Sequence, residues 1–233
     1  MKADGVDLTT YTTFTRLLSE GGSGKRGTNH TIPNRHGEHS NPLKWFTASD
    51  LMLEVGLAGT EGYTNLSIVQ RLLSGPHVVL ERTTPVGTVE AVVELLGPPQ
   101  PTQNRFVYVF PLRCPSGSWY TKTVSTATGN PPTVVTLGDR PVGDMVVTFS
   151  GVGTATHTDT DGNISVLEIE SAAGAGTYVV DCGARTVTKG GVDQERYFQA
   201  SQPWWWVFSP GATQTIASTV SITVDWHHRW AAG

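Results

Sequence analysis

The sequence contains little charge and no excess of positive charge. Asp, Glu, Lys and Arg make up 15% of the 233 residues, and the formal net charge is −4. A groove that binds nucleic acid through its phosphates needs clustered Lys and Arg side chains. The composition therefore argues against a nucleic-acid-binding protein.

Long apolar segments are also lacking. No apolar run approaches the roughly 20 residues that a membrane-spanning helix needs. The residues after Met1-Lys2 are polar and lack the apolar stretch of a secretory signal peptide. We therefore expect a protein that is made in a cytoplasm and has no membrane partner.

Cysteine is rare, with Cys114 and Cys182 the two in the chain. They lie far apart and lack the close paired spacing of a structural zinc site. We interpret both as buried thiols, and a disulfide between them is the alternative that the sequence leaves open.

Motifs for phosphate or metal binding are incomplete in the N-terminal region. Gly24-Lys25 follows a glycine-rich run, but the first glycine and the Ser or Thr of a phosphate-binding loop are missing. His30, His36 and His39 have a spacing that fits no closed zinc site. We interpret these histidines as loop residues and predict no metal site.

Calcium-binding and catalytic motifs are incomplete in the second half. Residues 159–163 contain part of a calcium-loop pattern, but no glutamate closes the loop. Asp161-Gly162 instead predicts a tight hairpin, because both turn positions tolerate positive φ. Glu168 and Glu170 alternate with apolar residues, as on the solvated face of a sheet, and no nucleophile motif is present. We predict that the chain is not an enzyme and has no cofactor.

Glycine and proline are plentiful, with 26 and 14 residues, and this composition favours many short strands joined by turns. In the first half we expect one helix at 65–74, capped by Thr64 or Asn65 and ended by Gly75-Pro76. Residues 1–43 are polar and irregular, which predicts an arm that needs a partner surface. Alternating apolar residues predict strands at 51–57, 77–82, 88–96 and 105–112.

The second half is predicted to be entirely β. Alternating segments between turn residues predict strands at 133–137, 144–150, 154–158, 164–169, 177–181 and 185–189. Many short strands at this spacing are typical of a β-sandwich. The small, polar and proline-rich stretch 125–132 is interpreted as the boundary, so the expected domains are residues 1–126 and 127–233.

The segment 201–230 is rich in tryptophan and is predicted to form two strands joined by a Pro-Gly turn. In the first strand Trp204, Trp206 and Phe208 fall on one face, while Trp205 and Val207 make the other face apolar as well. A strand that is apolar on both faces must be covered on both. The domain's own second sheet can supply one cover, and a neighbouring domain, subunit or ligand must supply the other. The predicted interface residues are Trp204, Trp205, Trp206 and Phe208. In the second strand the apolar residues alternate with polar ones, at Val220, Ile222, Val224 and Trp226.

Exposed aromatic side chains on a β-sandwich also stack on sugar rings. Trp205 and the pair Trp119-Tyr120 are the candidates for such a platform. Burial in a core or an interface explains the same side chains, so sugar binding is the alternative interpretation.

The order of these segments resembles that of the distal tail proteins of phages with long, non-contractile tails. In the second half the resemblance rests on GDRPVGDMVVTFSG (138–151), DTDGNISVLEIE (159–170), GTYVVDC (176–182), PWWWVFSPGATQTI (203–216) and VDWHHRW (224–230). In the first half it rests on GKRGTNHTIPNRHGEH (24–39) and SDLMLEVGL (49–57), followed by one helix and further strands. The resemblance spans most of the chain as an order of elements with loose motifs, and it brings no catalytic residues.

This resemblance implies a mainly β protein, in which a ring-forming N-terminal β domain with one helix precedes a galectin-like β-sandwich. It implies a structural role at the tail tip of the virion, as a homo-hexameric ring that continues the tail tube and lets DNA pass. The implied partners are further copies of the chain, the tail tube protein, the tape-measure protein and the tail-associated fibre or lysin protein. A carbohydrate-binding virion protein is the alternative function, and a tail-associated hydrolase is the third.

Overall fold

The computed structural model describes residues 1–20, 25–26, 30–31, 38–39, 45–46, 48–57, 61–104, 106–200 and 206–231. Within these residues the secondary structure consists of strands, three short 3-10 helices and one α-helix. The expected mainly β fold with one helix is confirmed. No helix in the described residues is both long enough and apolar enough to span a bilayer.

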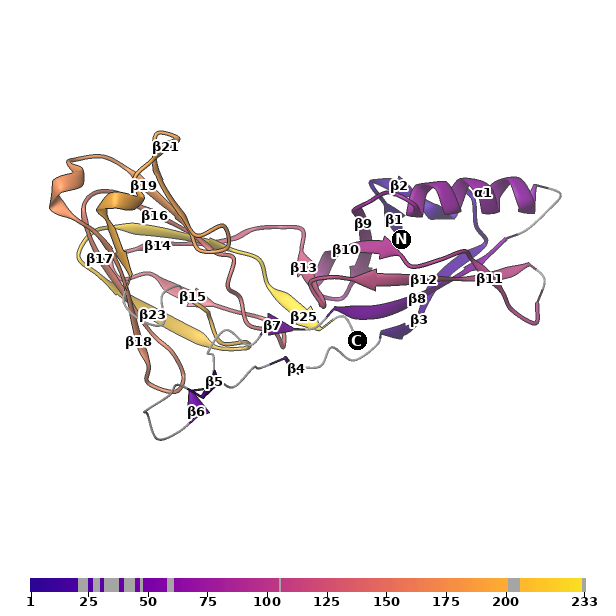
Figure 1. Cartoon of the computed structure of the whole chain (residues 1–233), viewed down its shortest axis with the longest axis horizontal. Helices are drawn as coiled ribbons and strands as arrows, with labels where there is room; N and C mark the ends of the chain where they lie inside the picture. Colours follow the sequence, from indigo (N-terminus) through magenta and orange to yellow (C-terminus); the bar gives the residue numbers. More distant parts are fainter. Residues whose placement is uncertain are drawn as a thin grey trace. The chain divides into compact units, whose positions relative to one another are not determined.

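The chain packs as two compact units. The first unit comprises Met1–Lys122 and the chain end from Trp230, and the second unit comprises Thr123–Arg229. The chain therefore leaves the first unit after Lys122 and returns to it at Trp230. The domains predicted from the sequence divide a few residues later, between 126 and 127, and the predicted sandwich includes the whole C-terminal segment. Figure 1 shows the strands of both units, coloured along the chain.

Ten strands form one sheet in the first unit, in the order β2-β1-β9-β10-β12-β8-β3. Beside this path, β11 pairs with β12, while β13 pairs with both β10 and β25. The bounds are β1 Lys2–Ala3, β2 Val6–Asp7, β3 Phe14–Glu20, β8 Ser49–Gly56, β9 Val78–Thr84, β10 Gly87–Leu95, β11 Gln100–Pro101, β12 Val107–Cys114, β13 Ser118–Thr121 and β25 Arg229–Ala231.

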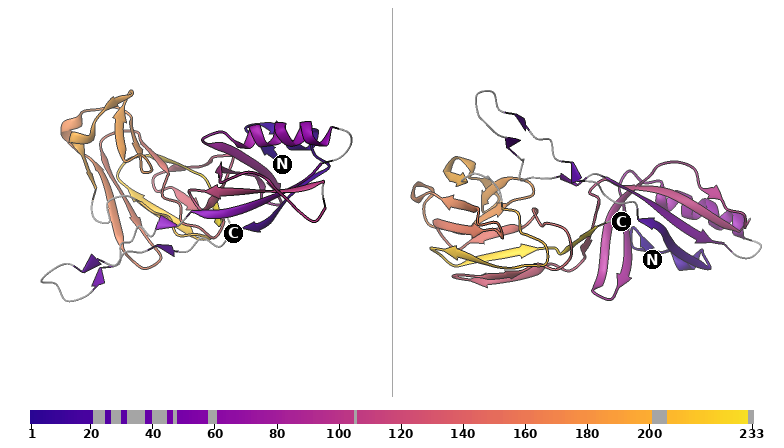
Figure 2. Two further views of the ribbon diagram at one scale, coloured as in Figure 1. Left: turned by 45° about the vertical axis from the view of Figure 1, so that its right-hand side comes forward. Right: turned by 90° about the horizontal axis from the view of Figure 1, so that it is seen from below.

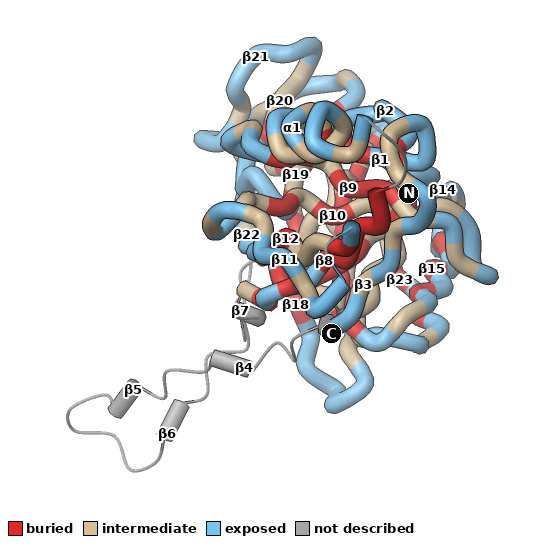
Figure 3. The backbone as a smooth tube through the Cα atoms, turned by 90° about the vertical axis from the view of Figure 1, so that its right-hand side faces the viewer, coloured by how far each residue is buried: buried red, intermediate tan, exposed pale blue. Residues whose placement is uncertain are grey.

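The core of the first unit lies between this sheet and the helix α1 (Gly62–Leu73), which runs along one face of the sheet (Figure 1). Val69 and Leu73 of the helix are buried in one cluster with Leu51, Leu53 and Val55 of β8. Figure 3 shows buried residues on β8, β9 and β10 and exposed residues along the outer side of α1. The predicted apolar stripe of the helix therefore packs as expected.

The helix begins earlier than predicted. Its N-cap is Glu61, which makes no side-chain capping bond. The backbone N–H of Asn65 already donates to the Glu61 carbonyl, at 2.9 Å, so Thr64 and Asn65 lie inside the first turn. The C-cap is Ser74, directly before the predicted stop at Gly75-Pro76.

The expectation of an irregular arm over residues 1–43 is wrong for its first twenty residues. Strands β1, β2 and β3 belong to the ten-stranded sheet, and Ala3 and Leu8 are fully buried in the core. The alternation in this stretch is short and interrupted by polar residues, so its place in the sheet comes from long-range pairing with β8 and β9.

Between β3 and β8 the structure describes four short strands. They are β4 (Lys25–Arg26), β5 (His30–Thr31), β6 (Glu38–His39) and β7 (Trp45–Phe46). The outer pair, β4 and β7, and the inner pair, β5 and β6, are both antiparallel. Of the predicted arm beyond Glu20, the structure describes β4, β5 and β6, and the rest of that stretch lies outside the described residues.

The second unit is a β-sandwich, as predicted, with its two sheets face to face (Figure 2). One sheet has six strands in the order β14-β24-β16-β19-β20-β21, and the other has five in the order β15-β23-β17-β18-β22. The bounds are β14 Ser125–Gly129, β15 Thr133–Val135, β16 Val146–Phe149, β17 Gly153–Thr158, β18 Ile164–Ile169, β19 Tyr178–Asp181, β20 Thr186–Lys189, β21 Val192–Asp193, β22 Phe198–Ala200, β23 Thr213–Ser218 and β24 Ile222–Trp226.

The predicted hairpin turn at Asp161-Gly162 is present in the sandwich, and a second tight turn lies at Gly190-Gly191. Gly162 has a φ of 82° between β17 and β18, and Gly190 and Gly191 have φ values of 57° and 80° between β20 and β21. In the first turn, Asp159 Oδ1 accepts hydrogen bonds from the backbone N–H groups of Asp161 and Asn163, at 2.9 and 2.7 Å. Side-chain acceptors of this kind stabilise tight turns.

Two local predictions in the second half are wrong. The stretch interpreted as a boundary contains β14, whose Ser125 lies opposite Trp226 of β24. In the described end of the strand expected around Trp206, residues 206–208, the backbone forms an isolated bridge between Phe208 and Val142, and residues 201–205 lie outside the described residues. The strand that precedes β24 is instead β23, in the stretch read as connection.

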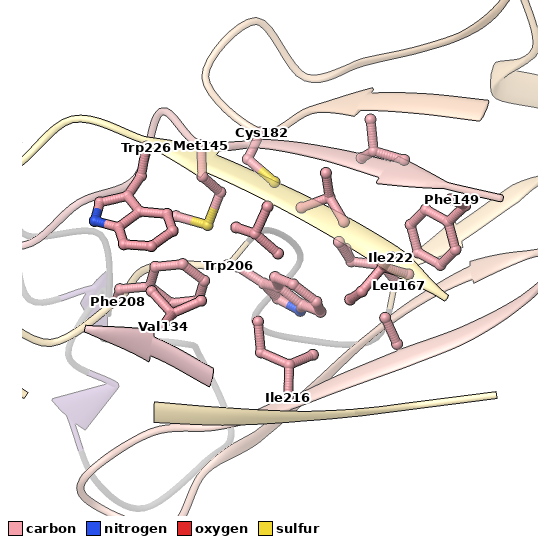
Figure 4. Packing of buried hydrophobic residues seen from close by; sticks show 14 of the residues in the cluster. Val134, Met145, Phe149, Leu167, Cys182, Trp206, Phe208, Ile216, Ile222 and Trp226 are labelled. Carbon is pink, nitrogen blue, oxygen red and sulfur yellow. The ribbon is translucent and has the colours of Figure 1, made fainter. Parts of the chain in front are cut away.

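Trp206 and Phe208 lie at the centre of the sandwich core, and both are fully buried. Figure 4 shows their rings between the two sheets, together with Ile216 from β23 and Ile222 from β24. Trp206 Nε1 donates to the carbonyl oxygen of Ser165, at 3.3 Å. One of the two predicted covers for this segment is therefore the sandwich itself.

A histidine is buried in this core. His157 contacts the rings of Trp206 and Phe208, with centroids 5.9 and 5.0 Å away. Its Nε2 is hydrogen-bonded to Gln214 Oε1. Burial lowers the pKa of His157, while the bond to Gln214 and the charge of Asp159 act in the opposite direction.

We expect the second unit to lose stability as the pH falls below about 6.5, the ordinary pKa of histidine. Below that pH the unfolded chain binds a proton at His157 that the folded unit does not, so folding becomes less favourable until the lowered folded pKa is reached. Urea unfolding at pH 7.5 and pH 5.5 measures this difference. His157→Asn should reduce it, and an unchanged pH dependence in that variant would contradict the assignment.

Candidate assembly surface

The predicted interface residues are divided by the structure. Trp206 and Phe208 are enclosed in their own unit and expose no surface. Val207, on the opposite side of the segment, is half-buried. Trp204 and Trp205 lie outside the described residues. A second cover for this segment stays a prediction.

Of the three candidates for sugar stacking, the structure describes Trp119 and Tyr120. Trp119 is fully buried in the core of the first unit. The Arg82 guanidinium lies over its ring, 4.3 Å from the centroid. A ring enclosed in this way offers no face to a sugar, so the structure gives Trp119 a packing role. Tyr120 is half-buried, and Trp205 lies outside the described residues.

The two cysteines and Asp159, which also stood out in the sequence, have structural roles. Cys114 and Cys182 are free and buried, as the first interpretation predicted. Burial raises the pKa of Cys182 to about 12, so its thiol stays protonated at neutral pH. Asp159 is held within its hairpin turn, and no cluster of three metal-binding side chains occurs in the part of the chain that the structure describes. His36 and the side chains of His30 and His39 lie outside that part.

A different surface stands out on the first unit. It is the face of strands β3, β8 and β12 that points away from the core. Leu51, Leu53 and Val55 of β8 are fully buried on the core side, so Met52 and Glu54 point to the other side. We call this side the assembly face, and it consists of Phe14, Arg16, Leu18, Met52, Glu54, Val109 and Pro111.

Apolar side chains dominate the assembly face. Phe14, Leu18 and Met52 are 40%, 45% and 45% exposed. Val109 and Pro111 of β12, which lie opposite Glu54 and Met52, are half-buried. Scattered apolar side chains are normal on a protein surface, but adjacent ones on one sheet face mark a contact surface.

Two features of β3 shape this face. A bulge between Leu17 and Ser19 inserts Leu18 next to Met52, and bulges bend a strand and redirect a side chain. Phe14 lies directly over Gly56, where any side chain would collide with its ring. β3 is also the last strand in the order of its sheet, so one edge of it has no strand partner among the described residues.

An ion pair lies in the middle of the assembly face. Arg16 Nε is paired with Glu54 Oε2. Glu54 is almost fully buried, whereas the Arg16 side chain is largely exposed, with its guanidinium 6.0 Å from the Phe14 ring centroid. Burying a carboxylate without a partner costs free energy, and Arg16 supplies the partner here. The predicted strand at 51–57 includes Met52 and Glu54, but Arg16 lies within residues 1–43, which were predicted to form an arm, so the pair could not be predicted from the sequence.

No protein-family model matches the chain, and no curated protein matches its sequence. Its structure is similar to the crystal structure of the Dit protein of phage SPP1, described as a paradigm of the hub adsorption apparatus in phages that infect Gram-positive bacteria. The TM-score is 0.68 and the identity 15%, with 97% of each chain covered. The Ca form of the activated phage P2 baseplate gives a TM-score of 0.43 at 11% identity, covering 95% of this chain and 92% of that chain. The Sr form gives 0.37 at 11%, covering 91% and 89%. At such identities the likeness to SPP1 Dit shows the fold, and the resemblance to phage distal tail proteins is confirmed at that level.

Proposed function

We propose that this chain is a structural protein of a phage tail tip and that its first unit assembles into a ring. The observation that carries the proposal is the likeness to SPP1 Dit, which covers 97% of both chains. Because a fold alone does not specify a function, this step is an argument by analogy. It assigns the chain to the virion, in the hub of the tail.

The finer details follow from the resemblance to distal tail proteins. The ring would be hexameric and would continue the tail tube, with the tube and tape-measure proteins on one side and the fibre or tail-associated lysin protein on the other. The sandwich would be of galectin type. A net charge of −4 suits a channel through which DNA passes without being held.

The assembly face supports a ring independently of the analogy. A closed ring is built from heterologous interfaces, in which two different surfaces of one subunit meet. Strands β3 and β8 together carry apolar side chains on both sides of the sheet, since Phe14, Leu18 and Met52 are exposed on the side opposite the buried Leu51 and Leu53. Strands of this kind are covered on both sides in folded proteins. A second copy of the first unit is the cover that we propose.

The proposed role requires no catalysis. A ring that joins a tube to a fibre acts through its interfaces, and none of the described residues was assigned to a reaction. The chain is thus proposed to be a structural component and not an enzyme.

Light scattering coupled to size-exclusion chromatography tests the ring. We expect purified protein at micromolar concentration to give a mass several times that of the chain, either alone or after addition of the tail tube protein. A monomer under both conditions would contradict the proposal.

A further inference from the structure

His228 lies where the chain leaves the second unit, between the end of β24 and Arg229, the last residue of that unit. Its ring makes three hydrogen bonds to three separate segments. Nδ1 is 3.0 Å from the backbone N of Leu137 and 3.3 Å from Nε1 of Trp226, and Nε2 is 3.0 Å from Oγ of Ser125. The Trp226 and His228 rings meet edge to face, with centroids 6.0 Å apart.

These contacts fix the protonation state of the ring. The backbone N–H of Leu137 and the indole N–H of Trp226 are donors that cannot accept a hydrogen bond. Nδ1 must therefore present its lone pair to both of them, and the proton of the neutral ring must lie on Nε2, where it donates to Ser125 Oγ. A second proton on Nδ1 would point at two N–H groups, so both hydrogen bonds would be lost.

The three partners belong to different parts of the sandwich. Ser125 and Trp226 face each other on β14 and β24, which are neighbours in the six-stranded sheet. Leu137 follows β15, an edge strand of the five-stranded sheet. The ring thus links the two sheets at the end where the chain enters the unit at Thr123 and leaves it after Arg229.

The segment after Leu137 is attached to the same place. Gly138 and Arg229 form a parallel bridge. The backbone N of Arg140 donates to the carbonyl oxygen of Arg229, at 3.3 Å, and Arg229 pairs with Asp144, at 2.6 Å. The segment from Leu137 to Arg140 is therefore held to the exit of the unit by His228 on one side and by backbone bonds on the other.

We propose that His228 is an acid-sensitive clasp, which closes the two sheets of the sandwich at the end where the chain enters and leaves, and which opens when the ring is protonated. The proposal does not depend on the ring function. Opening releases the backbone N–H of Leu137 and the indole N–H of Trp226 to solvent. The opened segments are those that connect the sandwich to the first unit.

The surroundings of the ring favour its neutral form. Burial lowers the pKa of His228, and the neighbouring His227 lowers it further. The charged or titratable side chains on the adjoining elements are Asp139, Arg140, Asp144, Asp225, His227 and Arg229. Asp144 is already paired with Arg229, and Asp225 accepts a hydrogen bond from Thr126, at 2.6 Å.

Hydrogen exchange and NMR on the full chain test the clasp. The ring of His228 should titrate below about 6.5, and the indole signal of Trp226 should shift in the same transition. After correction for intrinsic exchange, the Leu137 amide should exchange about tenfold faster for each pH unit as the pH falls from about 6.5 towards that transition, and its exchange should level off once the ring is protonated. Amides of β16 serve as the internal control, because global unfolding caused by His157 would expose them as well.

Two variants separate the clasp from other acid effects. His228→Asn keeps an acceptor near the position of Nδ1 but cannot titrate, so Leu137 should remain protected from pH 8 to pH 5. His227→Gln leaves the three bonds in place, so the transition should persist. The proposal is overturned if protonated His228 leaves Leu137 and Trp226 protected, or if the transition survives in His228→Asn. The wild-type titration decides the matter even if that variant fails to fold.

Discussion

Replacing Trp206 with alanine should lower the free energy of unfolding of the second unit by about 3–5 kcal/mol, the usual cost of truncating a large buried aromatic side chain. The ring is fully buried between the two sheets. It contacts Phe208, at 6.1 Å between centroids, and donates to the Ser165 carbonyl. Its removal leaves a cavity and takes one hydrogen bond away from the buried Ser165 carbonyl, and both effects destabilise the fold.

Urea unfolding at pH 7.5, with hydrogen exchange to identify the unit that opens, measures this loss. Trp206→Phe keeps much of the apolar volume and should cost less than the alanine variant. Tyr63→Ala is the matched control, because that aromatic side chain is 79% exposed on α1, and surface truncations usually change stability by less than about 0.5 kcal/mol. A Trp206→Ala midpoint equal to that of the wild type would mean that the ring does not support the core.

Regular alternation was sufficient to predict much of the sandwich. In β24 the buried residues Ile222, Val224 and Trp226 alternate with half-buried Thr223 and Asp225, as the sequence indicated. Such a pattern needs only a strand with one face on a core. The turn at Gly162 was equally predictable from the sequence, because a positive φ is a requirement of the local backbone.

Segments whose structure depends on distant partners were not predictable in this way. Ser125–Gly129 is small and polar, which is typical of a linker, yet it forms β14 by pairing with β24. Trp206 and Phe208 have the spacing of strand residues, but the backbone there has a single bridge, to Val142. Both rings are buried in the core of their own unit, whereas they were predicted as interface residues, because the apolar character of a side chain indicates burial without indicating which surface covers it.

The assembly face could likewise be predicted only in part. The alternation of Met52 with buried leucines was visible, and it indicates which residues point outward. Its neighbours Phe14, Arg16 and Leu18 come from β3, which local pattern did not identify. Only the register of β3 against β8 places them beside Met52 and Glu54. The local sequence around Arg16 and around Glu54 contains no pattern that predicts their contact, because the two residues are far apart in the chain.

Replacing Met52 with lysine should break the proposed ring while leaving the subunit folded. Met52 is 45% exposed in the single chain, so a lysine there can reach solvent and should change the stability of the monomer by less than about 0.5 kcal/mol. In a closed interface the same charge would be buried without a partner. A cost of roughly 3 kcal/mol at each interface corresponds to about a hundredfold weaker association between subunits.

Val192→Lys provides the matched control, because Val192 is 63% exposed on β21 of the second unit and lies on a different surface. Light scattering across a concentration series should show smaller species for Met52→Lys and unchanged assembly for Val192→Lys, with far-UV circular dichroism confirming that both variants are folded. Loss of assembly in both variants would indicate a general effect of added charge, because the two substitutions change net charge equally. Wild-type assembly by Met52→Lys would exclude the outer side of β3, β8 and β12 as the contact between subunits, whereas the likeness to SPP1 Dit would stand, since it concerns the fold and not this surface.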